Sequence, residues 1–302
     1  MENIILLFLC LFLGLALQKV PQFPKNAYQS LNQYVIYVSL PALALYYIPK
    51  ITISLALLYP LGIAWLGFGL SFLFFYSIGT YLKWSKKLIG CLILTGGLSN
   101  TSFVGFPIIE ALYGSEGLKT AIIVDQPGSF VVVTTLGILV AASFSRGNLN
   151  TSKILMKILK FPPFIAFSIA ILCTILSLDF PNSLQSSFLK IGNTVTPVAL
   201  VAVGLQLKID TKSKHWSFLA LGLFFKLFLM PAFFFLLYRI ILGENQLEIT
   251  VSIMESAMAP MITASILATN YGLKPKLSTM MIGIGIPLSL ISLVFWYYIL
   301  KM

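Results

Sequence analysis

Charged and redox-active residues are scarce in this chain of 302 residues. Only 10% of the residues are charged, nine of them Asp or Glu, and there is a single His. The three Cys lie singly in apolar segments without CxxC spacing, so the sequence indicates neither a disulfide framework nor a thiolate metal site. The hydrolase patterns GxSxG, HExxH and paired GxGD are also missing. We therefore expect no enzyme activity, no cofactor and no bound metal.

Apolar residues dominate instead, at 58% of the chain and a mean hydropathy of +0.95. These values are typical of a polytopic membrane protein and exclude both a soluble domain and a disordered chain. The first apolar segment lacks the basic start and the small-residue cleavage site of a signal peptide. We expect it to remain as the first span.

Apolar runs long enough to cross a bilayer, about 20 residues with shorter ones tolerated, occur ten times. The predicted spans are 3–18, 31–48, 52–80, 88–113, 119–143, 162–178, 185–207, 216–240, 247–271 and 277–300. The sequence thus predicts an all-α polytopic membrane protein with ten transmembrane helices.

The basic residues are distributed unevenly over the predicted loops. Fourteen of the twenty Lys and Arg residues fall in the loops after the odd-numbered spans, and five fall on the opposite side. Because basic loops stay in the cytoplasm, both termini are expected outside. Orientation also accounts for the net charge of +11, so membrane lipids rather than nucleic acid are the expected surroundings.

Two features recur about 155 residues apart. The motif YVSLPALAL (37–45) resembles NTVTPVALVAVG (193–204), and spans 4 and 9 are interrupted near Pro107 and Pro260. Five spans per half is an odd number, so the second half would be inverted relative to the first, as in inverted-repeat transporters. Each proline could start a half-helix whose N-terminal end faces the centre and suits an anion. The alternative is a pair of ordinary proline kinks.

The stretch GGLSNTSFVGFPIIEALYG (96–114) resembles the auxin efflux carrier family, the plant PIN-type carriers and their bacterial relatives. LNQYVIYVSLPALAL, NTVTPVALVAVGLQL and ESAMAPMITASILATNYG support the resemblance, which runs in order along essentially the whole chain. Two departures lie in span 9: Ala259 replaces a proline common in bacterial relatives, and Met261 or Thr263 stands where a polar Gln or Asn is usual.

The resemblance implies two inverted five-helix repeats with crossed broken helices 4 and 9. It implies a secondary active transporter, or permease, that works by elevator-type alternating access. The implied substrate is a small organic anion of the carboxylate class. The implied scaffold covers 1–50 and 146–210, and the transport domain covers 51–145 and 211–302. The resemblance further implies a homodimer through spans 2 and 7 and a place in the bacterial inner membrane.

By its matching position, Asn100 is expected to hold the substrate carboxylate. The other expected substrate-site residues flank the two breaks: Thr101, Ser102, Gly105, Pro107, Pro260, Met261 and Thr263. The alternative is that Asn100, Thr101 and Ser102 only cap the broken backbone, since these residue types compete for main-chain hydrogen bonds. One Asn can fill both roles.

Asp125, Glu255 and Lys226 lie inside predicted spans and are candidates for ion or proton coupling. An intramembrane carboxylate is costly and marks an ion path or a buried pair. The alternative for both acids is hydration near the outer surface. Lys226 is expected to pair with one of these acids, or alternatively to attract the anionic substrate. A channel or a membrane sensor on the same fold is the alternative function.

Overall fold

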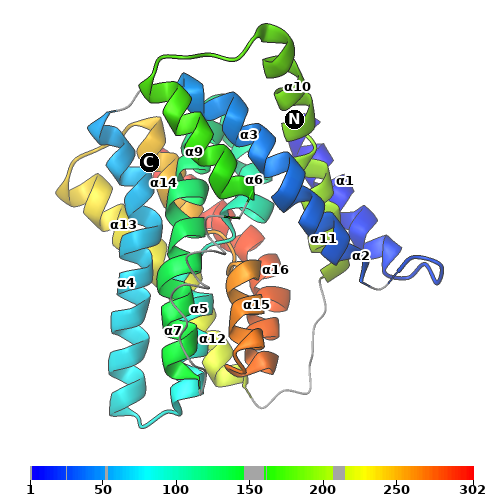
Figure 1. The fold of residues 1–302 in the computed structure, drawn as a ribbon. Coiled ribbons are helices and arrows are strands. Elements are labelled where there is room, and N and C mark those ends of the chain that lie inside the picture. The colour runs from blue at the N-terminus through cyan, green and yellow to red at the C-terminus, as the bar shows by residue number, and fades with distance from the viewer. Residues whose placement is uncertain (1, 25, 52–53, 146–159, 161, 207–214) are drawn as a thin grey trace.

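The computed structural model describes all residues except 1, 25, 52–53, 146–159, 161 and 207–214, and the regular elements of the described part are helices (Figure 1). The first half contains α1 (Glu2–Leu17), α2 (Ala27–Tyr34), η1 (Val35–Ser39), α3 (Leu40–Tyr47), η2 (Ile48–Lys50), η3 (Leu55–Leu57), α4 (Leu58–Tyr81), α5 (Lys86–Gly97), η4 (Thr101–Gly105), α6 (Phe106–Ile123), η5 (Val124–Phe130), η6 (Val133–Gly137) and α7 (Ile138–Phe144). The second half contains α9 (Pro162–Ile175), α10 (Asn182–Gly192), α11 (Val195–Gln206), α12 (Trp216–Phe224), η7 (Phe225–Leu229), α13 (Met230–Phe234), η8 (Phe235–Ile241), α14 (Leu247–Ser256), α15 (Ile262–Asn270) and α16 (Pro275–Lys301).

Six helical stretches of the described chain are long and apolar enough to cross a membrane, and two shorter apolar helices accompany them. The six are Ala27–Lys50, Leu55–Tyr81, Thr101–Phe144, Asn182–Gln206, Trp216–Ile241 and Pro275–Lys301. The two shorter ones are Ile5–Leu17 and Pro162–Ile175. The structure therefore confirms the all-α class of a polytopic membrane protein.

A kink at Gly114 replaces the loop that the sequence predicts between 113 and 119. The helical path from Thr101 to Phe144 is 44 residues long and turns sharply at Gly114, where φ is 64° and ψ is −159°. No atom lies within 4 Å of the place that a Cβ would occupy there. Glycine is therefore favoured by the backbone angle rather than by lack of space, because residues with a Cβ rarely adopt a positive φ.

Wider, π-helical turns accompany four prolines of the long helices, Pro41, Pro107, Pro127 and Pro231. The turns η1, η4 and η7 each end two residues before a proline, and η5 contains one. A proline ring clashes with the carbonyl four residues earlier and offers no N–H to it, so a wider turn relieves the contact. The carbonyl of Leu227, which Pro231 leaves without its helical donor, accepts a hydrogen bond from the indole N–H of Trp296 at 2.9 Å.

The helices pack in two groups. The first group contains α1, α2, α3, α9, α10 and α11, and the second contains α4 to α7 and α12 to α16 (Figure 1). Within the first group, the hydroxyls of Ser39 and Thr194 are hydrogen-bonded at 2.8 Å. This contact joins the two motifs that resemble each other in the sequence.

Helices α1 and α11 approach so closely that their backbones touch. A Cβ added at Gly14 would lie 2.8 Å from the Cα of Gly204, and one added at Gly204 would lie 2.8 Å from the Cα of Gly14. Small residues are typical of membrane helices whose backbones are in contact, because association there depends on close packing.

Replacing Gly204 by Ala should destabilise the protein by about 1 to 3 kcal/mol, because the added methyl forces two backbones apart. Gly69→Ala is the matched control, since nothing lies within 4 Å of its added Cβ. Thermal or denaturant unfolding in one detergent measures both variants. Equal stability of the two variants would contradict the close packing of α1 and α11.

Candidate functional site

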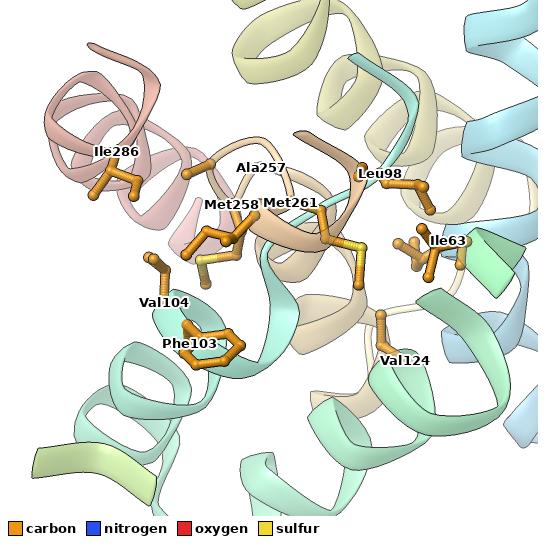
Figure 2. Close-up of a cluster of buried hydrophobic side chains, with 14 of the residues drawn as sticks. Ile63, Leu98, Phe103, Val104, Val124, Ala257, Met258, Met261 and Ile286 are labelled. Carbon is orange, nitrogen blue, oxygen red and sulfur yellow. The ribbon is translucent and has the colours of Figure 1, made fainter. Parts of the chain in front are cut away.

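Two helices are interrupted in the centre of the second group. Residues 98–100 separate α5 from η4, and residues 257–261 separate α14 from α15. Figure 2 shows the two interruptions passing over each other, surrounded by apolar side chains. We call these two segments the crossing.

Backbone hydrogen bonds join the two segments of the crossing. The N–H of Asn100 donates to the carbonyl of Ala259 at 2.8 Å, and the N–H of Met261 donates to the carbonyl of Leu98 at 2.9 Å. The segments run antiparallel, as in a short piece of β-sheet. Each interruption thus supplies hydrogen-bond partners that the other has lost from its helix, which is the condition for open backbone at membrane depth.

The restarted helices do not begin where their prolines predict. Pro107 was expected to start a half-helix, but η4 begins six residues earlier and leads into α6 without interruption, so that prediction is wrong. The reason is a cap: the side-chain Oδ1 of Asn100 accepts a hydrogen bond from the N–H of Phe103 at 3.2 Å. In the other interrupted helix, α15 starts two residues after Pro260 and ends at Asn270.

Asn100 has one half of its amide engaged and the other half free. The side chain is 1% exposed, and its Oδ1 is the cap just described. Its Nδ2 has no hydrogen-bond partner in the described part of the chain. A buried polar group without a partner is costly, so this N–H₂ is suited to a ligand that supplies an acceptor. Asn100 therefore caps the helix with its Oδ1, and this cap leaves its Nδ2 available for another partner.

Asp125 lies at the centre of a network of three donors. Its Oδ1 accepts from the hydroxyls of Thr101 at 2.6 Å and Ser102 at 2.7 Å, and its Oδ2 accepts from the amide of Gln126 at 2.9 Å. The carboxylate is 2% exposed, which rules out the hydrated position considered from the sequence. The two hydroxyls expected in the substrate site are directed to Asp125 instead, while the Oε1 of Gln126 has no described partner.

Glu255 is equally buried but has no such donors. It is fully buried in the last turn of α14, and neither carboxyl oxygen has a hydrogen-bond partner among the described residues. The carboxyl group lies against the backbone of Gly105, where an added Cβ would approach all three carboxyl atoms closer than 3.0 Å. Gly105 is therefore the residue that leaves room for Glu255. In the described ranges, no three His, Cys, Asp or Glu side chains gather at one place.

Lys226 does not pair with an acid. Its fully buried ammonium donates to the hydroxyl of Ser99 and the carbonyl of Ser256, both at 2.6 Å, and contacts the sulfur of Met230 at 3.2 Å. Within the described chain, no ion pair of 4.0 Å or less joins it to a carboxylate, although the charge of Glu255 acts on it from a greater distance. The acceptors of the crossing are nearer than either acid. Since all three N–H groups of the ammonium are occupied, none is left for an anionic substrate.

The remaining expected site residues line or support the crossing. Pro107 is buried in the first turn of α6, and Pro260 packs against Gly285 of α16. Met261 is buried near Leu98, whereas Thr263 is half-buried in the first turn of α15 (Figure 2). Met261 and Thr263 therefore have different surroundings.

Several site residues were missed from the sequence. Ser99 and Ser256 hold Lys226, but a serine in an apolar run gives no distinctive signal. Glu110 was also missed; its Oε2 accepts a hydrogen bond from the hydroxyl of Thr196 at 2.8 Å, which joins α6 to α11 and so connects the two helix groups. Here a signal existed, because Glu110 is an acidic residue in an apolar segment.

Comparisons with known proteins show that the chain belongs to a family of membrane transport proteins. The sequence profile of a family described as membrane transport protein matches residues 1–297. An uncharacterized transporter of Methanocaldococcus jannaschii is 30% identical over 280 residues, which cover 89% of each chain. An uncharacterized transporter of Methanothermobacter thermautotrophicus is 26% identical over 210 residues, which cover 69% of this chain and 67% of the relative.

Removing the carboxylate of Asp125 should strongly destabilise the fold. Asp125→Ala leaves three buried donors without their acceptor, so we expect a loss of about 3 kcal/mol or more in the free energy of unfolding. Asp125→Asn, which keeps an acceptor for the two hydroxyls, should lose less. Unfolding of the purified protein in detergent measures these differences.

Glu116→Ala is the matched control for Asp125→Ala. Glu116 forms an ion pair with Lys119 at 2.8 Å, but its side chain is 67% exposed. Its loss should therefore cost less than about 1 kcal/mol. If Asp125→Ala were no more damaging than this control, the network around Asp125 would not support the site.

Proposed function

Because this chain belongs to the membrane transport protein family, which includes the auxin efflux carriers, we propose that it is a secondary active transporter of a small organic anion of the carboxylate class. Its family and its relatives are transporters rather than enzymes. The choice of an anionic substrate rests on the buried Nδ2 of Asn100, which has no partner in the described chain and lies at the crossing of two broken helices.

The crossing offers further donors to an anion. Both η4 and α15 begin there, and the first turn of a helix has N–H groups without intrahelical partners and a positive partial charge. Such ends bind carboxylates and phosphates. The amide and the two helix ends attract an anion through partial charges, and no N–H group of the Lys226 ammonium is left to bind it. This favours both binding and release, as transport requires.

We propose ten spans in two inverted repeats of five. Two contacts support this arrangement: Ser39 touches Thr194 across 155 residues, and Ser99 touches Ser256 across 157 residues. Similar separations at two distant places fit a repeat whose halves lie face to face. In this proposal the kink at Gly114 separates span 4 from span 5, and the interrupted pairs α5 with α6 and α14 with α15 belong to spans 4 and 9.

The two packing groups correspond to a scaffold and a moving domain. In our proposal the scaffold is 1–50 and 146–210, the transport domain is 51–145 and 211–302, and the latter moves as an elevator past the former. The hydrogen bond between Glu110 and Thr196 lies on the boundary between them. We further propose a homodimer through spans 2 and 7, in the inner (plasma) membrane. α1 begins and α16 ends toward the same end of the molecule (Figure 1), and the distribution of basic residues over the predicted loops favours the outside for that end.

We propose Glu255, rather than Asp125, as the group that couples a proton to transport. Three donors contact the carboxylate of Asp125, whereas Glu255 has no described donor and only the more distant charge of Lys226 offsets its own. A buried charge without hydrogen-bond donors is costly. Glu255 also lies against Gly105, in the same turn that Asn100 caps. A charged Glu255 and a bound carboxylate would repel each other. A proton on Glu255 therefore favours the anion, and by linkage the anion favours the proton.

Uptake of labelled small carboxylates by the purified protein in liposomes tests the function directly. In this assay Asn100→Ala should raise the apparent dissociation constant about tenfold or more, because a hydrogen bond to a charged group is lost. Asn100→Asp should be worse. It keeps an oxygen that caps the helix but replaces the N–H₂ donor by a negative charge.

Asn270→Ala is a suitable control, since Asn270 is exposed at the far end of α15. It should transport like the wild type. Normal transport by Asn100→Asp, combined with unfolding of Asn100→Ala in detergent, would reduce Asn100 to a cap and place the anion elsewhere.

Glu255→Gln should transport at a rate that no longer depends on pH, because the replacement cannot exchange a proton. Substrate binding should remain detectable. Glu248→Gln, at the exposed start of α14, provides a control that keeps the wild-type profile. The measurement is uptake into liposomes over a series of pH values. An unchanged profile in Glu255→Gln would exclude Glu255 as the coupling group.

A further inference from the structure

The atoms around Lys226 resemble the binding site of a small cation. We propose that the Lys226 ammonium is a tethered cation that permanently fills a cation site at the crossing. In transporters with discontinuous helices, unwound carbonyls and the C-terminal ends of half-helices coordinate the coupling cation. The ammonium of Lys226 has two such partners, both at 2.6 Å: the hydroxyl of Ser99 in the first interruption and the carbonyl of Ser256 at the end of α14, just before the second interruption.

The electrostatic balance of the site supports this assignment. Ser256 is the last residue of α14, and α5 also ends at the crossing. The C-terminal end of a helix carries a partial charge of roughly −0.5, so two such ends together balance about one positive charge. The ammonium is fully buried and has no ion pair with a carboxylate in the described chain. Helix ends and neutral oxygens therefore contact the ammonium directly, while the charge of Glu255 acts on it from beyond 4.0 Å.

The position of Lys226 in the chain makes this cation a crosslink. The lysine lies on η7, which belongs to neither interrupted helix, and its ammonium bonds at once to Ser99 in the first interruption and to the last residue of α14. The side chain of Ser99 also donates to the Ser256 carbonyl at 3.4 Å, so the two ligands lie together without the lysine. Removing the ammonium should therefore leave a preformed pair of oxygen ligands around an empty space.

A covalently attached cation has a consequence for coupling. It cannot be taken up on one side of the membrane and released on the other, so transport would not depend on Na⁺. This consequence rests on the proposed transport function, whereas the occupancy of the site by Lys226 does not. Unfolding measurements, which need no substrate, can therefore test the occupancy separately from uptake.

The first measurement uses the unmodified protein. Its unfolding midpoint in detergent should be the same in NaCl, LiCl and choline chloride at equal ionic strength, because the site is already filled. Stabilisation by Na⁺ or Li⁺ over choline would overturn the proposal. This comparison decides the question even if Lys226→Ala cannot be isolated as a folded protein.

The second measurement uses Lys226→Ala, which empties the site and keeps its ligands. Its unfolding midpoint in choline chloride should fall by more than about 5 °C. Na⁺ or methylammonium at about 100 mM should restore at least half of that loss, because a ligand that binds only the folded state stabilises it. Choline, which is too large for the space of an ammonium, should not. Adding Ser99→Ala to this variant should abolish the restoration.

Two controls make the second measurement specific. Lys226→Met fills the space without a charge, so it should lose stability but gain nothing from Na⁺ or methylammonium. Lys119→Ala removes a lysine near the surface and should respond to salts like the wild type. Wild-type stability of Lys226→Ala, the absence of restoration by either cation, or equal restoration of Lys226→Met would each overturn the proposal.

Discussion

The pairing of two open backbone segments is the constraint on which the centre of this structure depends. Inside a bilayer an unpaired N–H or carbonyl group costs several kcal/mol, so a helix interrupted there must find partners within the protein. The hydrogen bonds from Asn100 to Ala259 and from Met261 to Leu98 satisfy this need for both helices at once. Neither interruption can exist without the other. The buried polar side chains described above are arranged around this mutual dependence.

Residues that are neighbours in the sequence have different tasks at the crossing. Asn100 caps η4 and keeps a free N–H₂, whereas Thr101 and Ser102, the next two residues, direct their hydroxyls to Asp125. Asn100 precedes the helix with non-helical backbone angles, φ −81° and ψ 67°, so its side chain leaves in another direction than the two hydroxyls of the first turn. The polar stretch is therefore not one binding surface. It combines a ligand-facing amide with the support of a buried carboxylate.

The sequence predicts the helical class and the approximate places of the interruptions, because apolar runs and prolines are local signals. It does not predict that η4 starts at Thr101 rather than at Pro107, since that depends on the cap that Asn100 provides. The sequence also does not predict the partners of Lys226. Hydropathy gives the depth of a residue in the membrane but not the direction of its side chain. Ser99 and Ser256 became acceptors only through contacts between distant segments.

The π-helical turns beside the prolines have a consequence for comparing this chain with its relatives. A π-helical turn closes its hydrogen bond over one residue more than an α-helical turn. A relative that has an ordinary helix at Pro231 in place of η7 would accordingly have one residue fewer there, although no loop is present. A gap of a single residue in an alignment of such a helix then marks a π-helical turn that one protein has and the other lacks. Closing such a gap to improve an alignment would shift every later residue of that helix by about 100° around its axis.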